Sequence, residues 1–417
     1  KKSSAEDDKK KKRSKEGEGS GKRKKGDRPK KKKELKPVEK GQKPVESDNT
    51  TTSYTTASVD RTIMDRTIAD RSERLVGRDP DQSNPKQLDA IRHFVKGILD
   101  KKVEGLLEEF KELKGYNLDP WPIDAFNANT DRNRYKDIFC VDSTRVVLKD
   151  GNGTDYIHAN FVRGDPFPNS YICTQGPLDT TIVDFWRMVL QEEVGYIVML
   201  CDFIEIGKLK CARSFPEELN KPQIWKAGNM SIRVSVTKFD NVSEPLFDYR
   251  TLVLEATGKP SRIVHHFQWR NWPDRGVPES TMAVMNVLRQ IRATKYTAVI
   301  HCSAGVGRTG TLVAIEWMLQ TLLQGKAGDM KEMLKQMRHM RAHAIQTNMQ
   351  YVYVAQAIYR QLCKLDPTPD NIASYRAFSE EMRQAHVLLA CTPNGGGELP
   401  LPPPPPRVEE VNKVAGK

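Results

Sequence analysis

Hydrophobic positions divide the chain into a beginning with almost no apolar pattern, a middle rich in short apolar runs, and an end with helical periodicity. Residues 1–53 contain four apolar side chains and no aromatic ring, and residues 54–83 are rich in Ser, Thr, Asp and Arg. Such a segment cannot bury enough surface to offset the conformational entropy that folding removes. We therefore predict that residues 1–83 form a disordered, basic N-terminal tail.

The first helical pattern begins at the pair Asn84-Pro85, which suits a helix N-cap followed by proline at the first helical position. Apolar residues then recur at helical spacing from 88 to 113. Gly97 and Gly105 mark the points where we expect this helical segment to break.

Between residues 120 and 300, short runs rich in β-branched and aromatic residues predict strands. One amphipathic segment, TIVDFWRMVLQEE, predicts a helix that opens with the capping pattern Thr181-x-x-Asp184. After residue 300 the pattern becomes helical. The almost continuous apolar character of residues 309–324 predicts a buried helix. A stripe of methionines over residues 330–340 predicts core packing. A last helix should begin at Thr347-x-x-Gln350 and end near residue 365.

Strands followed by a cluster of helices indicate a mixed sheet flanked by helices. We therefore predict the α/β class, in its α+β form, with one domain over residues 84–366. Beyond Pro367 the chain is rich in Pro and Gly and its periodicity is weak. We predict that residues 367–417 form a Pro-rich, largely disordered C-terminal tail.

Positive charge is concentrated at the start of the chain. The sequence has 67 Lys and Arg against 54 Asp and Glu, a formal net charge of +13, and residues 1–40 alone contain 19 basic and 8 acidic side chains. Basic runs of this kind suit weak contact with anionic surfaces, or nuclear import. A tail that merely stays solvated explains them equally well.

No apolar run reaches the ~18 residues that a membrane-spanning helix needs, so we predict no membrane span. The seven cysteines are scattered and form no C-x-x-C pair, which indicates neither a zinc site nor a disulfide framework. A reducing compartment fits this usage best, so we expect the cytoplasm, the nucleus or both. The first residue is Lys1 rather than Met, which leaves room for an upstream segment.

The segment that points to chemistry is AVIHCSAGVGRTGTL at residues 298–312, a buried strand, a loop with two glycines and a buried helix. Cys302 and Arg308 lie six residues apart around the expected amino end of that helix. Free backbone N–H groups and the helix dipole favour an anion there. Gly305 and Gly307 let the backbone curl so that the donors converge, and a guanidinium can hold two phosphate oxygens at once.

This environment favours the thiolate of Cys302, the nucleophilic form of cysteine. A thiolate that faces a phosphate site is suited to attack phosphorus. The alternative is that Cys302 is an ordinary buried thiol and that the glycines only shape a turn. The combination of a cysteine, two glycines and an arginine at one helix start favours the functional interpretation.

The stretch HCSAGVGRTG resembles the H-C-x5-R-[ST] signature loop of the protein tyrosine phosphatase family. Further blocks resemble the family in the expected order: NRYKD at 133–137, TQGPL at 174–178, KCA at 210–212, NWPDRGVP at 271–278 and QTNMQY at 346–351. NRYKD is similar to the family's phosphotyrosine-recognition loop and NWPDRGVP to its mobile W-P-D loop. The resemblance runs from about residue 87 to 366 and implies a highly twisted mixed sheet in a non-receptor-like, tyrosine-specific catalytic domain.

The resemblance implies hydrolysis of phosphotyrosine on proteins without a metal or a cofactor. Cys302 would attack phosphorus and form a cysteinyl-phosphate, and Arg308 would clamp the phosphate oxygens. Asp274 would act as general acid and then as general base. The other catalytic positions that the resemblance implies are Gln346, which would orient water, Thr309, which would donate to the departing sulfur, and His301, which would help to fix the loop.

Substrate binding is implied at the walls of the same cleft. Tyr135 would stack on the substrate ring and make the cleft too deep for phosphoserine, Asp137 would accept hydrogen bonds from the peptide backbone, and Trp272 would serve closure of the W-P-D loop. The phosphate would be bound by the amides of Ser303, Ala304, Gly305, Val306, Gly307 and Arg308. Gln350 joins this set, although it can equally be the capping partner of Thr347.

Three departures from the family pattern bear on substrate preference and rate rather than on reaction class. The family usually continues KCA with Tyr-Trp-Pro, whereas residues 213–216 here are RSFP. Ile206 stands where a lysine is common. His343 stands near the pocket rim, where glycine is frequent, and its ring would narrow access for bulky substrates.

Two other functions compete with a tyrosine-specific phosphatase. A phosphotyrosine-binding module without turnover would need damage at Cys302, Arg308 or Asp274, and all three are present. A phosphatase of broader specificity, acting on phosphoserine, phosphothreonine or lipid, typically has a shorter domain without the NRYKD block.

A proline-rich stretch runs from Pro400 to Arg407 and contains a P-x-x-P-x-R element at 402–407. Such a segment adopts a polyproline II helix that Src-homology-3 or WW modules bind. A stiff spacer is an equally good interpretation.

Overall fold

The computed structural model describes residues 84–390, except residues 115, 117–121, 245 and 279. The predictions for residues 1–83 and for the proline-rich stretch at 400–407 lie outside the described residues. Within the described part, the order of elements follows the hydrophobic pattern: a helical start, a strand-rich middle and a helical end.

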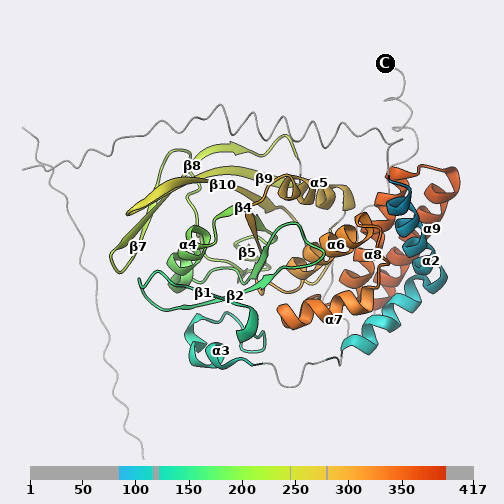
Figure 1. The fold of residues 1–417 in the computed structure, drawn as a ribbon, viewed down its shortest axis with the longest axis horizontal. Coiled ribbons are helices and arrows are strands. Elements are labelled where there is room, and N and C mark those ends of the chain that lie inside the picture. The colour runs from blue at the N-terminus through green and yellow to red at the C-terminus, as the bar shows by residue number, and fades with distance from the viewer. Residues whose placement is uncertain (1–83, 115, 117–121, 245, 279, 391–417) are drawn as a thin grey trace, which may run out of the picture. The chain divides into compact units, whose positions relative to one another are not determined.

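The centre of the domain is a nine-stranded mixed sheet (Figure 1). Its strands are β1 Arg145–Val147, β2 Tyr156–Val162, β3 Tyr171–Thr174, β4 Val194–Met199, β7 Gln223–Ala227, β8 Met230–Asp240, β9 Phe247–Ala256, β10 Lys259–Trp269 and β11 Thr297–His301. Their order across the sheet is β1-β2-β3-β11-β4-β10-β9-β8-β7, and the neighbours from β3 to β10 run parallel. A separate hairpin pairs β5 Ile204–Glu205 with β6 Lys208–Leu209.

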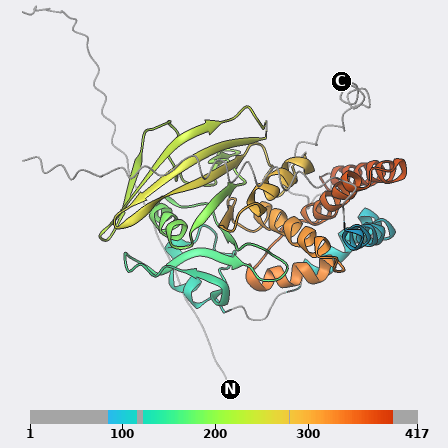
Figure 2. The same ribbon diagram turned by 45° about the horizontal axis from the view of Figure 1, so that its top comes forward.

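Helices surround this sheet, as the sequence predicts for the fold class. They are α2 Pro85–Lys114, α3 Asp124–Ala128, α4 Ile182–Gln191, α5 Thr281–Arg292, α6 Arg308–Leu323, α7 Met330–Met340, α8 Asn348–Leu365 and α9 Pro369–Ala390. In both ribbon views α4 lies apart from the cluster of α5, α6, α7 and α8 (Figures 1 and 2). Helices α2 and α9 pack on α8 at the outside of that cluster.

The core is densest where the parallel strands meet α6. All six residues of β4 are buried, and α6 buries every residue from Arg308 to Leu319. Parallel strands covered by helices read as continuous apolar runs, which is why the sequence shows no alternation there. Met330, Met333 and Met337 of α7 are buried, so the prediction that the methionine stripe is core is confirmed. The amino end of α6 is thereby held at the carboxyl end of β11.

The prediction of a disordered segment after Pro367 is wrong for Pro369–Ala390, which form α9. Phe378 and Met382 are buried against α8, and Tyr375 packs edge-on against the Tyr359 ring at 5.5 Å. These apolar positions recur at three- and four-residue spacing. Long polar side chains stand between them and on the rest of the helix, which hides the pattern in the sequence.

The break in α2 falls at Lys102, with φ 58° and ψ −179°, and the prediction of a break at Gly97 or Gly105 is wrong. The turn that starts at Val103 needs a partner for its backbone N–H. A carboxylate oxygen of Glu381, on α9, accepts a hydrogen bond from that N–H at 3.0 Å. A tertiary contact, which no local pattern reveals, therefore decides where this helix breaks.

Of the two helix caps that the sequence predicts, one is confirmed and the other is wrong. Thr347 and Gln350 form the predicted capping box at the start of α8. Thr181 does not cap α4, because its hydroxyl accepts a hydrogen bond from the Leu178 backbone at 2.9 Å. Asp184 instead forms ion pairs with Arg132 and Arg187.

We expect Glu381→Ala to lower the free energy of unfolding by about 1 kcal/mol, because it removes the acceptor that caps the second half of α2. The measurement is chemical denaturation of the two proteins side by side. Arg376→Ala, an exposed position on the same helix, is the matched control and should change the stability much less. Equal losses in the two variants would contradict the capping role.

Candidate active site

The loop between β11 and α6 is the centre of the site. Cys302 follows β11 directly and its side chain is buried. The Cys302 Sγ accepts a hydrogen bond from the Gly305 N–H at 3.2 Å. Gly305 has φ +71°, and a Cβ there would lie 2.1 Å from the Thr174 carbonyl oxygen. Only glycine fits at this position, so the strand–loop–helix interpretation of the sequence is confirmed in its local geometry.

The carbonyl groups of this loop point away from the sulfur. The Ser303 carbonyl accepts from the Gly176 N–H at 3.0 Å, and the Val306 carbonyl accepts from the Ile345 N–H at 3.0 Å. The two carbonyls between them accept from one guanidinium: Arg341 donates to Ala304 at 3.0 Å and to Gly305 at 3.1 Å. Because successive carbonyls are held outward, the amide N–H groups face the opposite side, where an anion can collect them.

Arg308 begins α6 and is 1% exposed. Its two terminal nitrogens donate to the Glu205 carboxylate at 2.5 and 3.0 Å, and one of them also donates to the Trp272 carbonyl at 2.9 Å. Burial by itself lowers the pKa of the guanidinium, but the hydrogen bonds with Glu205 and the nearby acidic groups raise it on balance. The Arg308 Nε is buried and has no hydrogen-bond partner within the described residues. One donor of this permanent cation is therefore free for a ligand.

The Asp274 carboxylate is in direct contact with Arg308. One carboxylate oxygen accepts from the Arg308 guanidinium at 3.3 Å, and the other accepts from the Lys210 ammonium at 2.6 Å. Partial burial raises the pKa of Asp274, but the two cations outweigh it and hold the pKa below its ordinary value. Asp274 is therefore a carboxylate in this arrangement.

Trp272 anchors the loop that carries Asp274. Its indole is 3% exposed, donates to the Gly276 carbonyl at 3.1 Å and packs against the Trp269 ring at 4.9 Å. The Trp272 side chain is thus packed in the core of the domain, and the Trp272 backbone carbonyl accepts a hydrogen bond from Arg308. The hydrogen bonds from Arg308 to the Trp272 carbonyl and to Asp274 hold the Asp274 carboxylate beside the Cys302 loop.

Tyr135 lies beside the loop as the resemblance implies. Its hydroxyl is 2.8 Å from the Ser303 Oγ, which in turn donates to the Lys210 carbonyl at 3.0 Å. The neighbouring Arg134 ties this segment down by donating to the carbonyls of Gly176 and Pro177 at 3.0 and 2.6 Å. These bonds bring a tyrosine ring to the rim of the Cys302 loop.

A hollow of about 530 Å³ is lined in part by Gln346, whose side chain lies against Gly307 of the Cys302 loop. Asp137, Arg275, His343 and Gln346 are among its lining residues. The His343 ring packs against the Phe139 ring at 5.2 Å. Asp137 is exposed, so its carboxylate is accessible from the hollow.

Two predicted residues occupy the buried side of the loop. His301 is 1% exposed and burial lowers its pKa to about 4, so the imidazole is neutral at physiological pH. The Thr309 hydroxyl is buried and has no hydrogen-bond partner among the described residues. The implied bond from Thr309 to the Cys302 sulfur is therefore not formed in this structure.

Gln350 holds backbone groups on two sides of the site. Its side-chain oxygen accepts from the backbone N–H of Gln346 at 3.0 Å, and its side-chain nitrogen donates to the Gly276 carbonyl at 3.3 Å. The side chain is fully buried and forms the capping box with Thr347, as the capping alternative predicts, and a contact of Gln350 with substrate stays a prediction. The Gln346 oxygen lies against the loop, 2.5 Å from the place that a Cβ on Gly307 would occupy.

Three residues of the site were missed as functional positions in the sequence. Glu205 orients Arg308, Lys210 holds Asp274, and Arg341 holds the loop carbonyls. Arg341 is completely buried, and its partners among the described residues are two loop carbonyls, Asn160 and His158. Lys210 belongs to the KCA block that resembles the family, and this block was the only sign in the sequence of a functional role for it. No pattern in the sequence near Glu205 or Arg341 indicates which residues they bind.

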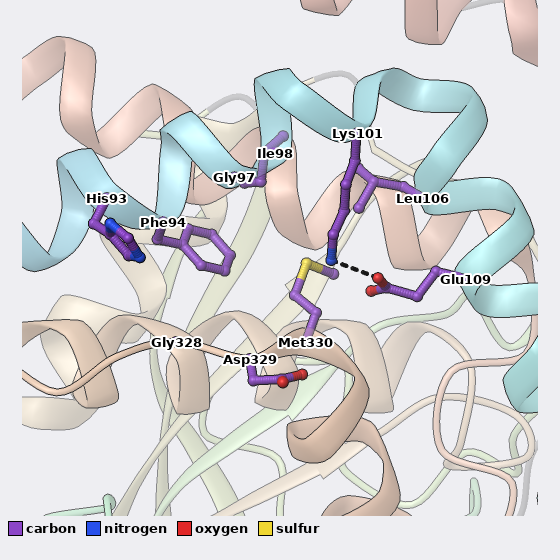
Figure 3. A pocket seen from close by; sticks show the side chains of 10 residues that line it. All are labelled: His93, Phe94, Gly97, Ile98, Lys101, Leu106, Glu109, Gly328, Asp329 and Met330. Carbon is purple, nitrogen blue, oxygen red and sulfur yellow. Dashed lines mark hydrogen bonds and ion pairs between the residues drawn. The ribbon is translucent and has the colours of Figure 1, made fainter.

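A smaller hollow of about 130 Å³ lies between α2 and the start of α7, away from the Cys302 loop (Figure 3). The Lys101 ammonium donates to the Glu109 carboxylate at 2.5 Å inside it, and Glu109 also accepts from the Tyr351 hydroxyl at 2.5 Å. None of the predicted site residues lines it. Its polar groups hold the broken helix α2 against α8.

Comparison with known proteins identifies the class. Residues 129–360, more than half of the chain, match the family model described as protein-tyrosine phosphatase. The chain is 36% identical over 361 residues to the tyrosine-protein phosphatase non-receptor type 18 of Mus musculus, across 78% of this chain and 77% of that protein. This chain belongs to the protein tyrosine phosphatase family.

The chain is also 34% identical over 314 residues to the receptor-type tyrosine-protein phosphatase zeta of Homo sapiens. That match covers 68% of this chain but spans only 13% of the relative's length. A solved structure, reported as the structural basis of the PTPN18 fingerprint on distinct HER2 tyrosine phosphorylation sites, is 31% identical with a TM-score of 0.55. It covers 65% of this chain and 99% of the solved chain.

Among the helices of the described ranges, none combines the length and the apolar character that crossing a bilayer requires.

We expect Lys210→Met to move the alkaline limb of the kcat/KM profile to higher pH. Loss of a neighbouring cation raises the pKa of Asp274, so its acid form persists to higher pH. The measurement is phosphatase activity against pH in a buffer series at constant ionic strength. Lys208→Met, an exposed position on the same hairpin, is the control and should leave the limb in place. A shift to lower pH in Lys210→Met would contradict the assignment.

Proposed function

We propose that the chain hydrolyses phosphotyrosine on proteins through a cysteinyl-phosphate intermediate. The Cys302 sulfur attacks phosphorus while the bond to the tyrosine oxygen breaks, and Asp274 gives its proton to that oxygen. Water then attacks the phosphorus of the intermediate, Asp274 takes a proton from it, and the bond from sulfur to phosphorus breaks. The products are tyrosine, inorganic phosphate and the regenerated thiolate.

The observation that carries this proposal is the arrangement of donors around one sulfur. The Gly305 N–H donates to Sγ, and the loop carbonyls from Ser303 to Val306 are all directed outward. The helix dipole of α6 and the Arg308 cation add positive potential at the same point. This arrangement stabilises a thiolate and, at bond-making distance, the oxygens of a phosphate.

Asp274 gains its proton when substrate binds. In the free protein, the cations Arg308 and Lys210 keep it ionised. A phosphate dianion that pairs with Arg308 places negative charge beside Asp274 and so raises its pKa. The same carboxylate is then a better acid in the complex than in the free protein, which couples protonation to substrate binding.

The remaining residues position these groups. Gln346 lies against Gly307, where a hydrolytic water would approach the intermediate. The unpaired hydroxyl of Thr309 is available to donate to the sulfur as it leaves. Neutral His301 fixes the strand end through its contact with the Cys302 carbonyl at 3.4 Å. The loop that carries Trp272 lies closed on Arg308, and this closed arrangement directs Asp274 toward the tyrosine oxygen.

Phosphotyrosine is the substrate that the rim favours. The Tyr135 ring beside Ser303 raises the wall of the cleft, so a phosphoserine side chain, which is shorter, cannot bring its phosphorus to Cys302. Asp137 accepts hydrogen bonds from the substrate backbone. One similar solved structure is reported as the structural basis of the PTPN18 fingerprint on distinct HER2 tyrosine phosphorylation sites, which supports phosphotyrosine proteins as the class of substrate.

We expect phosphate release from a phosphotyrosine peptide, in the presence of EDTA, to fall to background in Cys302→Ser. The hydroxyl has about the same size as the thiol but is not ionised at neutral pH, so the nucleophile is lost. The wild type should release little phosphate from a matched phosphoserine peptide. Release from both peptides at similar rates would favour the broader-specificity alternative.

Asp274→Ala distinguishes an enzyme from a binding module. Loss of a general acid typically slows turnover by about 10²–10⁴-fold while leaving the phosphate contacts of Arg308 in place. Phosphopeptide affinity, measured by titration calorimetry, should therefore stay within a few fold of the wild type. A wild type that binds phosphotyrosine tightly and releases no phosphate would establish the binding module instead.

We further propose that the two ends of the chain serve targeting and that the protein works in the cytoplasm, the nucleus or both. The basic runs within residues 1–40 suit weak contact with anionic surfaces, and the stretch from Pro400 to Arg407 suits Src-homology-3 or WW modules. The free thiols of all six cysteines in the described part suit a reducing compartment. We expect an Arg407→Ala peptide to bind such modules more weakly than the native peptide; equal binding would remove the claim.

A further inference from the structure

We propose that Arg341 stabilises the Cys302 thiolate from behind the Cys302 loop, through the peptide group that joins Ala304 to Gly305. Arg341 is then a positioning residue, because its guanidinium acts on the sulfur through the loop backbone rather than by direct contact. The inference rests on the proposed cysteinyl-phosphate chemistry and adds a residue to it.

The peptide group between Ala304 and Gly305 has Arg341 at one end and the sulfur at the other. The Ala304 carbonyl accepts a hydrogen bond from a terminal nitrogen of Arg341 at 3.0 Å. The N–H of the same peptide group belongs to Gly305 and donates to the Cys302 Sγ at 3.2 Å. A trans peptide group directs its C=O and its N–H in opposite directions, so a fixed oxygen also fixes the direction of the hydrogen. A cation at the oxygen polarises the peptide group and strengthens the hydrogen bond to the sulfur.

The same guanidinium holds the next peptide group. The Arg341 Nε donates to the Gly305 carbonyl at 3.1 Å, so the N–H of that peptide group, which belongs to Val306, is directed away from Arg341. Two neighbouring carbonyls suit the planar fork of a guanidinium, whereas an ammonium has a single nitrogen and cannot occupy both places. The shape of the arginine side chain therefore matters as well as its charge.

The partners of Arg341 outside the loop are Asn160 and His158. Arg341 is completely buried, and it donates to the Asn160 side-chain oxygen at 2.7 Å. The Ile138 carbonyl can only accept, so the His158 Nε2 at 2.9 Å from it carries the proton, and Nδ1 accepts from Arg341 at 3.3 Å. Burial lowers the pKa of His158 to about 3, so the imidazole is uncharged at neutral pH. Both partners are therefore neutral.

Burial also keeps the other buried titratable side chains near Arg341 and Cys302 uncharged at neutral pH. It raises the pKa of the thiols and of the phenol and lowers the pKa of the imidazole in the set Cys140, Cys173, Cys201, Cys211, Tyr156 and His301. None of these six groups supplies a charge that offsets Arg341.

The charged groups on the open side of the loop are paired with one another. Two cations and two carboxylates bind there, namely Arg308, Lys210, Glu205 and Asp274. Opposite charges in contact offset part of each other's field. Arg134 at the rim donates to backbone carbonyls but is partly exposed, so water screens its charge. The buried charge of Arg341 has only neutral partners in the contacts described, so its field acts on the Cys302 loop with little loss.

The test is the pH dependence of Cys302 alkylation by iodoacetamide, a neutral reagent that reacts with the thiolate. Cys302→Ser gives the background from the other cysteines. We expect the pH of half-maximal alkylation to rise by about one unit in Arg341→Met, the size expected when a hydrogen bond to a charged group is weakened. Arg341→Lys keeps the charge but can hold only one carbonyl, so its profile should lie between those of Arg341→Met and the wild type.

Phosphatase kinetics give a second readout. In Arg341→Met, kcat should fall by about tenfold to a hundredfold while KM stays within a few fold, because the loop amides contribute most in the transition state. Arg338→Lys is the matched control. Arg338 is also buried on α7, but it donates to the carbonyls of Leu113 and Ala344. This variant should keep the wild-type alkylation profile.

An unchanged alkylation profile in a folded Arg341→Met would overturn the proposal, and so would a rise in KM without a fall in kcat. If thermal unfolding shows that neither variant at position 341 folds, Asn160→Asp decides. Its carboxylate would pair with the guanidinium and neutralise it, so the alkylation pH should again rise, and an unchanged profile would overturn the proposal. Alkylation needs no turnover. A wild type that is alkylated as expected but releases no phosphate would therefore contradict the proposed hydrolysis and leave the role of Arg341 in place.

Discussion

The buried ion pair between Arg308 and Glu205 holds the working parts of this domain together. A guanidinium that is 1% exposed has lost nearly all of its water, and only well-placed acceptors offset that loss. Glu205 supplies two of these acceptors and the Trp272 carbonyl a third. The β5–β6 hairpin, the loop of Trp272 and the amino end of α6 are therefore held to one another by a single charge.

The same logic applies beneath the catalytic loop. Arg341 is completely buried, and its partners are the carbonyls of Ala304 and Gly305 together with Asn160. Burial lowers the pKa of His158 to about 3, so the imidazole next to Arg341 adds no second charge. A cation whose partners are neutral leaves its field largely unneutralised. That field acts on the loop directly above it and favours an anion on the sulfur side.

The outer helices show how far such tertiary contacts extend. Helix α9 closes over α2 and α8, and its Glu381 satisfies the N–H that the break at Lys102 exposes. The periodic positions Phe378 and Met382 were present in the sequence, but polar neighbours masked them. The position of the break was not readable at all, because it depends on a residue far along the chain.

The sequence by itself determined the parts that are local. The turn of glycines between β11 and α6, the capping box at Thr347 and the buried character of α6 each depend on residues that follow one another, so short-range pattern was enough. Only the tertiary structure decided which side chains meet Arg308, Asp274 and the loop carbonyls. Glu205 and Arg341 come from segments far from the loop in sequence, and a charged residue has no periodic signal that names its partner. Coulombic and hydrogen-bonding contacts act through space, and their geometry exists only after the sheet and the helices have packed.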